Sequence, residues 1–100
     1  MDGDESLLRQ MAAITSADLP EVIEQTDRAL TAGNSEQAGS GLHKLKGMLS
    51  TFETSGVTIE VHEMLELLKR GEVAEAKKCF DRHRSELDEL VAEISSIAAK

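Results

Sequence analysis

The stretch AGSGLHKLKGMLSTF, residues 38–52, decides the fold because its apolar side chains recur at helical spacing. Successive members lie 4, 3, 4 and 3 residues apart, which places them on one side of a single helix. They are Ala38, Leu42, Leu45, Leu49 and Phe52. We therefore predict one helix over residues 35–53, with Asn34 as its N-cap and Gln37 three residues later.

The glycines in this stretch leave an alternative open. GSG at residues 39–41 is also typical of a loop, and Ser40 could then cap a shorter helix that starts just before His43. Ala38 would in that case be incidental to the apolar stripe.

The same helical spacing continues on both sides of this stretch. We predict further helices over about 4–15, from Asp18 to AGN at 32–34, from Val57 to about Arg70, and over roughly 73–98. The first has an apolar face formed by Leu7, Leu8, Met11 and Ile14. DLPE at 18–21 is a typical helix start, while Gly33 and Gly71 are typical helix ends. Short connections favour antiparallel neighbours, so we expect an all-α, antiparallel up-down four-helix bundle with an additional short N-terminal helix.

Composition narrows the class of protein. One hundred residues make a single domain over 1–100, and a net charge of −8 argues against binding nucleic acid or anionic lipid. Cys79 is the one cysteine in the sequence, so no internal disulfide forms and a reducing compartment is indicated. No apolar run approaches the ~20 residues that span a bilayer. We expect a cytoplasmic protein without membrane insertion.

One histidine has an unusual setting. The residues about one turn away from His43 on the helix are small or cationic, namely Gly39, Ser40, Lys46 and Gly47. Ser50, a further small residue, lies one turn beyond. Three glycines inside a helix would cost roughly 2–3 kcal/mol relative to alanine, which is a noticeable part of a typical stability. Small residues around a protruding side chain would let another protein approach His43 closely.

Lys46 suits His43 for nucleophilic chemistry. A second positive charge nearby is disfavoured, so the ammonium helps to keep the imidazole neutral and nucleophilic. The same ammonium could stabilise a phosphoryl group once it is attached. Lys44 points elsewhere and has a lesser role. The alternative is an ordinary surface histidine among glycines that are merely tolerated.

LHKLKGMLSTF resembles the signature of histidine-containing phosphotransfer (HPt) domains, written H-x-L-K-G, with His43, Leu45, Lys46 and Gly47 at the defined positions. The preceding helix and glycine turn, and the later LLKRGEVAEAKKCFDRHRSEL, are similar to the family pattern, so the resemblance covers nearly the whole chain. Departures are Leu42 before the histidine, Met48 and Leu49 after the motif glycine, and Glu53 where a glycine often ends the helix.

The resemblance implies a phosphorelay intermediate. His43 would carry a phosphoryl group, usually on Nε2, and exchange it with aspartates of response-regulator receiver domains. Lys46 would assist the phosphoryl group. The receiver would dock on a face formed by Gly39, Ser40, Lys44, Gly47 and Ser50. The domain would not be an enzyme by itself and would need no cofactor, because the receiver brings its own aspartate and Mg²⁺.

The N-terminus resembles the middle of the family's first helical region. This suggests the C-terminal module of a larger hybrid sensor kinase, which would then also be a partner. A free-standing, shortened protein is the alternative. A different function, a helical adaptor without chemistry, would use the small-residue face but would not need His43.

Other titratable residues have simpler interpretations. His83 falls between Phe80 and Leu87 at helical spacing, which favours a partly buried structural histidine. Cys79 and His83 are four residues apart and could share a metal, but zinc sites usually need three or four protein ligands, so we predict no metal site. His62 and Glu63 are expected on a solvated face.

Overall fold

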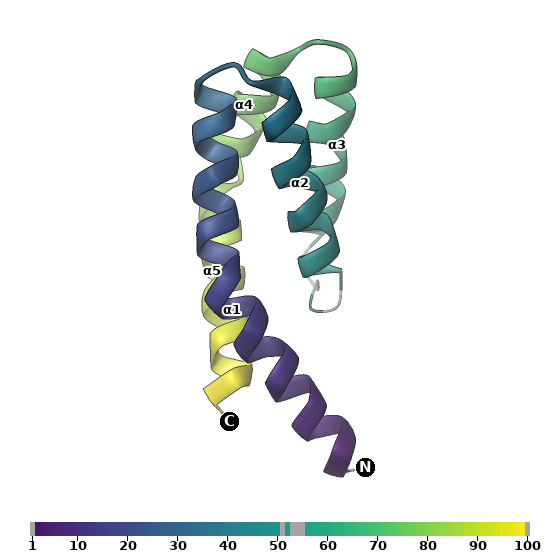
Figure 1. Cartoon of the computed structure of the whole chain (residues 1–100), viewed down its shortest axis with the longest axis vertical. Helices are drawn as coiled ribbons and strands as arrows, with labels where there is room; N and C mark the ends of the chain where they lie inside the picture. The colour runs from purple at the N-terminus through teal and green to yellow at the C-terminus, as the bar shows by residue number, and fades with distance from the viewer. Residues whose placement is uncertain (1, 51, 53–55, 100) are drawn as a thin grey trace.

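Five helices make up the described part of the chain. The computed structural model describes residues 2–50, 52 and 56–99, with side chains from Glu5 onwards. The helices are α1 (Asp2–Thr31), α2 (Ser35–Leu49), α3 (Val57–Lys69), α4 (Val73–Arg82) and α5 (Arg84–Ala99). Figure 1 shows α1, α2 and α3 as antiparallel neighbours, with α4 and α5 together forming the fourth arm. The predicted all-α, antiparallel four-helix bundle is confirmed, although some helix boundaries differ.

The central helix α2 starts as predicted. The Oδ1 atom of Asn34 accepts a hydrogen bond of 3.1 Å from the backbone N–H of Gln37. The helix continues through residues 39–41, so the loop alternative is wrong. It ends at Leu49, earlier than predicted, where the Ser50 hydroxyl donates to the Gly47 carbonyl at 2.9 Å. Residues 51 and 53–55, including Glu53, lie outside the described residues.

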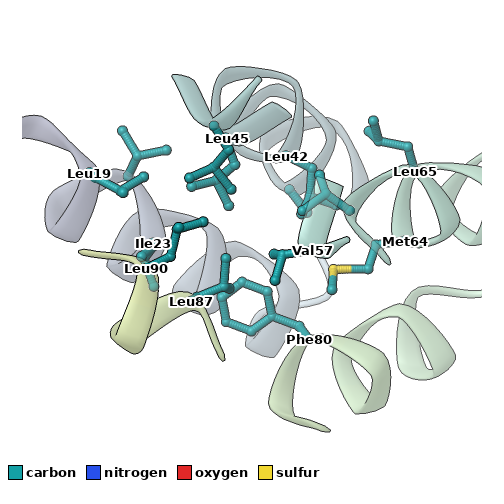
Figure 2. Packing of buried hydrophobic residues seen from close by; sticks show 14 of the residues in the cluster. Leu19, Ile23, Leu42, Leu45, Val57, Met64, Leu65, Phe80, Leu87 and Leu90 are labelled. Atoms are coloured by element: carbon teal, nitrogen blue, oxygen red, sulfur yellow. The ribbon is translucent and has the colours of Figure 1, made fainter. Parts of the chain in front are cut away.

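The core lies between the helices and is almost entirely aliphatic (Figure 2). Ala38, Leu42, Leu45 and Leu49, the predicted stripe of α2 up to its end, are all 0% exposed. Every other helix adds apolar side chains to the same cluster, among them Leu19, Ile23, Val57, Met64, Phe80, Leu87 and Leu90. Burial of about 0.8 kcal/mol per methylene makes this stripe the main anchor of α2.

Pro20 does not start a new helix, contrary to the sequence prediction. α1 runs without interruption from Asp2 to Thr31. Proline lacks an N–H and crowds the carbonyl one turn earlier, at Ser16, so it bends a helix without always ending it. Figure 1 shows α1 changing direction so that its N-terminal part leans away from the bundle. The helix persists because Leu19 and Ile23 are buried on either side of the proline.

The predicted apolar face at the start of the chain is mostly exposed. Leu7, Leu8, Met11 and Ile14 keep between 37% and 66% of their surface, and Ala12 is the buried residue among residues 5–18. The N-terminal part of α1 extends past the end of α2, so α2 leaves most of this face open, while the end of α5 lies beside it (Figure 1). Helical periodicity identified the face but could not show that its neighbour ends too early.

The predicted final helix is two helices. His83 adopts φ −103° and ψ 8° between α4 and α5, so the single helix over 73–98 is wrong. The break lets two stripes face different neighbours, because α4 packs mainly against α3 and α5 mainly against α1. Apolar spacing alone does not reveal a single residue that interrupts a helix.

An ion-pair network joins α1 to the α4–α5 arm. The Asp27 carboxylate accepts hydrogen bonds from Lys77 at 2.9 Å and from Arg84 at 3.1 Å. Arg84 also contacts Glu24, while Lys77 contacts Asp81. The Lys77 hydrogen bond lowers the pKa of Asp27 below its ordinary value, and the charges of Lys77 and Arg84 act in the same direction against partial burial. Folding therefore favours the ionised form of this carboxyl group.

Replacing Asp27 tests this network. The pKa of Asp27 is lowered in the folded state. Its contribution to the free energy of unfolding is therefore present above the unfolded pKa of about 3.9 and is lost as the pH falls through the folded pKa. We expect Asp27→Asn to lower the free energy of unfolding by about 1 kcal/mol at pH 7, less in high salt. Urea denaturation across pH 3–7 should show the gap from wild type narrowing in acid.

Asp18→Asn is the matched control. Asp18 lies exposed on the same helix and has no ion pair within the described residues. Its replacement should leave stability nearly unchanged at every pH. Equal effects of the two substitutions would mean that the Asp27 contacts contribute nothing specific.

Candidate functional site

His43 lies near the middle of α2, on the side turned away from the core. Its neighbours in sequence, Leu42 and Leu45, are fully buried, whereas His43 is exposed. The continuous helix through residues 39–41 fixes this orientation, because each residue advances the side-chain direction by a constant angle. The imidazole therefore projects into solvent from a rigid element, as a group that must meet a partner should.

The three glycines near His43 have different physical reasons. A Cβ on Gly41 would clash with the hydroxyl of Thr26 and lie 3.2 Å from its Cβ, so α1 and α2 require glycine there. A Cβ on Gly39 would meet Leu68 at an ordinary 3.9 Å, and one on Gly47 would meet nothing within 4 Å. Gly41 therefore serves internal packing, which corrects the view that all three glycines make room for a partner. Packing requires no glycine at position 47.

Thr26 explains why the helices can approach so closely at this point. Its side chain is fully buried, and its hydroxyl donates a 2.7 Å hydrogen bond to the Val22 carbonyl within α1. The polar group is thus satisfied within its own helix, and its outer side can lie against the bare backbone of Gly41. This contact sets the spacing between α2 and α1.

Two lysines of α2 are available to an incoming anion. Lys46 is half-buried and Lys44 is exposed. The other lysines in the described part of the chain pair with carboxylates: Lys69 with Glu66, Lys77 with Asp27 and Asp81, and Lys78 with Glu75. Neither Lys44 nor Lys46 makes such a pair among these residues. Lys44 and Lys46 thus place positive charge near His43 without an ion pair among the described residues, while Asp18 and Glu21 of α1 line the same hollow as Lys44.

The predicted docking residues divide between two sides of α2. Ser40, Lys44 and Gly47 line two adjoining hollows between α1 and α2, of about 540 and 570 Å³. Gly39 instead lies toward Leu68 of α3, and Ser50 is exposed at the end of α2. The hollows also include residues of α1 that the sequence analysis did not single out: Ile14, Gln25 and Arg28. Helical spacing could have placed Gln25 and Arg28 on one face, but not beside α2.

The titratable residues outside α2 are also placed. His62 is exposed beside Glu66, at 3.7 Å, as expected for a solvated face. His83 is partly buried between Glu60 and Glu86, in agreement with a structural histidine. Among the described residues, a set of side chains that could hold a metal ion is Glu60, Cys79 and His83, none of which belongs to α2.

The fold and this face define a helical-bundle module with an exposed histidine near the middle of α2. A family model described as Hpt domain matches residues 10–97. This chain therefore belongs to the Hpt domain family, whose members are phosphocarrier modules of two-component signalling. Searches of curated proteins and of solved structures found no match. None of the helices in the described residues combines the length and apolar character that a membrane crossing requires.

Alanine substitutions at two of the glycines separate packing from exposure. Gly41→Ala gains about 1 kcal/mol of helix propensity but introduces a clash worth about 1–3 kcal/mol, so we expect net destabilisation of up to about 2 kcal/mol. Gly47→Ala should stabilise the protein by about 0.5–1 kcal/mol, because its Cβ meets open space. Urea denaturation of the two variants provides the comparison. If both stabilise equally, α1 and α2 do not approach as closely as described.

Proposed function

We propose that His43 is the residue that carries the phosphoryl group in this Hpt domain, exchanging it with aspartates of response-regulator receiver domains. The observation that carries the proposal is the exposure of His43 at mid-helix, three residues before Lys46, which forms no ion pair among the described residues, in a chain of this family. We also propose that the protein acts in the cytoplasm, as its single cysteine indicates. A parent hybrid sensor kinase is a further proposed partner.

The transfer needs little from the Hpt domain beyond position and charge. The lone pair of neutral His43 Nε2 attacks the phosphorus of a receiver acyl phosphate, forming an N–P bond while the bond from phosphorus to the aspartate oxygen breaks. The aspartate leaves as a carboxylate. The reverse reaction returns the phosphoryl group to an aspartate of another receiver, and the Mg²⁺ belongs to the receiver.

Lys46 and Gly47 support different parts of this exchange. The Lys46 ammonium lies about one turn from His43 and has no competing carboxylate among the described residues, so it can stabilise the phosphoryl oxygens. Gly47 has no neighbour within 4 Å of its missing side chain, so the receiver can come close to the helix backbone there. Lys44 and Ser40 border the adjoining hollows and would contact the receiver.

Replacing His43 tests the central assignment. A panel of phosphorylated receiver domains should label the wild type with an acid-labile, base-stable phosphoryl group, and His43→Gln should abolish this label. The control is His62→Gln, which removes another exposed histidine and should leave labelling unchanged. Circular dichroism should show the same helix content in all three proteins. Equal labelling of His43→Gln would contradict the proposal, whereas partner binding without any labelling would favour the adaptor function.

The two lysines should separate chemistry from docking. Loss of a charge-assisted contact of about 1.5–3 kcal/mol predicts that Lys46→Ala slows transfer at saturating receiver roughly 10–100-fold. Lys44→Ala should instead weaken receiver binding and leave the saturated rate nearly unchanged. Rapid-quench transfer measured over a range of receiver concentrations distinguishes the two effects. Identical rates for Lys46→Ala and wild type would remove Lys46 from the mechanism.

A further inference from the structure

Three side chains with metal-binding groups converge where α4 meets α5. The Glu60 carboxylate of α3, the Cys79 thiol of α4 and the His83 imidazole at the junction place their ligand atoms within 4.8 Å of one another. Cys79 and His83 are four residues apart and therefore lie on the same side of the chain. Glu60 comes from a different helix, so the third group was not visible in the sequence pattern.

The orientation of His83 suits a metal ligand. Its Nδ1 atom lies 2.9 Å from Oε1 of Glu86, and its Nε2 atom lies 3.2 Å from Oε2 of Glu60. When Nδ1 carries the proton toward Glu86, Nε2 has a free lone pair, the arrangement of many zinc-binding histidines. A cation beside this lone pair would also lie within reach of the Glu60 oxygen.

Cys79 adds a soft donor in a sheltered position. Its residue exposure is 7%. A divalent ion bound here would hold the thiol as the thiolate, because a coordinating thiol is deprotonated outright. The cluster thus combines a thiol, an imidazole and a carboxylate in a partly buried place, unlike an exposed group of acidic residues.

The spacing fits tetrahedral coordination. Bonds of about 2.0–2.1 Å from zinc to nitrogen and oxygen put these two atoms about 3.3–3.4 Å apart, close to the 3.2 Å between His83 and Glu60. Bonds of about 2.3 Å to sulfur put the sulfur about 3.5 Å from the nitrogen. The Cys79 sulfur lies at most 4.8 Å from the other ligand atoms, so it has to move by little more than about 1 Å. A rotation of the thiol can supply this movement.

We propose that Glu60, Cys79 and His83 form a binding site for a zinc-class divalent ion, with water as the fourth ligand. On binding, Cys79 releases its thiol proton to solvent and forms the sulfur–metal bond. The ion would tie α3 to the α4–α5 junction and stabilise the bundle. Thiolate and imidazole ligands select Zn²⁺ over Mg²⁺, so this site is separate from the Mg²⁺ chemistry of a receiver partner.

Cobalt titration of the full chain tests the site. We expect Co²⁺, added to the reduced apoprotein, to produce a thiolate-to-cobalt charge-transfer band and tetrahedral visible bands at one equivalent, and Zn²⁺ to displace it. Cys79→Ser should remove the charge-transfer band, and Glu60→Gln should weaken binding at least about tenfold. Glu86 contacts His83 and is not itself a proposed ligand, so Glu86→Gln should weaken Co²⁺ binding about 10–100-fold and keep the charge-transfer band. His62→Gln is the control and should bind as wild type.

Amide resonances and thermal stability test the same site by other means. Zn²⁺ added to the ¹⁵N-labelled wild type should shift the amide resonances around residues 60, 79 and 83, while Mg²⁺ should not. The melting temperature should rise with Zn²⁺ in the wild type but not in Cys79→Ser. A cobalt spectrum without the thiolate band, equal Zn²⁺ affinity in wild type and Cys79→Ser, or resonance shifts confined to His43 or His62 would each overturn the proposal.

Discussion

The burial of one side of α2 is the constraint on which the rest of the structure depends. Leu42, Leu45 and Leu49 are completely removed from solvent, and this fixes the rotation of the helix about its own axis. His43 then has to point outward, because it follows Leu42 by a single residue. The group proposed to react is therefore positioned by the hydrophobic core and not by polar contacts of its own.

The glycines show how stability and function act on the same helix. At Gly41 the close contact with Thr26 makes glycine the residue that packs best. At Gly47 no contact requires glycine, and a larger residue would favour the helix. A glycine on an open face, beside the exposed His43 and lysines without an ion pair among the described residues, is consistent with the docking surface proposed here. Around α2, the residues that hold the bundle are thus distinct from those proposed to meet a partner.

The α4–α5 junction is a second point at which charge and helix geometry act together. Arg84 and Lys77 bind Asp27 on the side facing α1, while His83 lies between Glu60 and Glu86 on the side facing α3. The helical hydrogen bonding is interrupted at His83, between these two sets of contacts. The junction therefore makes charged contacts with both α1 and α3.

The sequence by itself determined the helical class, the buried stripe of α2, the turns at Gly33 and Gly71, and the exposure of His43. These features are local or periodic, so the spacing of residues along one helix is enough to predict them. Only the tertiary structure decided the continuity of α1 through Pro20, the break at His83, the exposure of Ile14 and the packing role of Gly41. Each of these features depends on a neighbouring helix: on whether that helix covers a face, where that helix ends and how closely it approaches. The meeting of Glu60 with Cys79 and His83 has the same physical reason, because no spacing within one helix can show which residue of another helix will lie beside it.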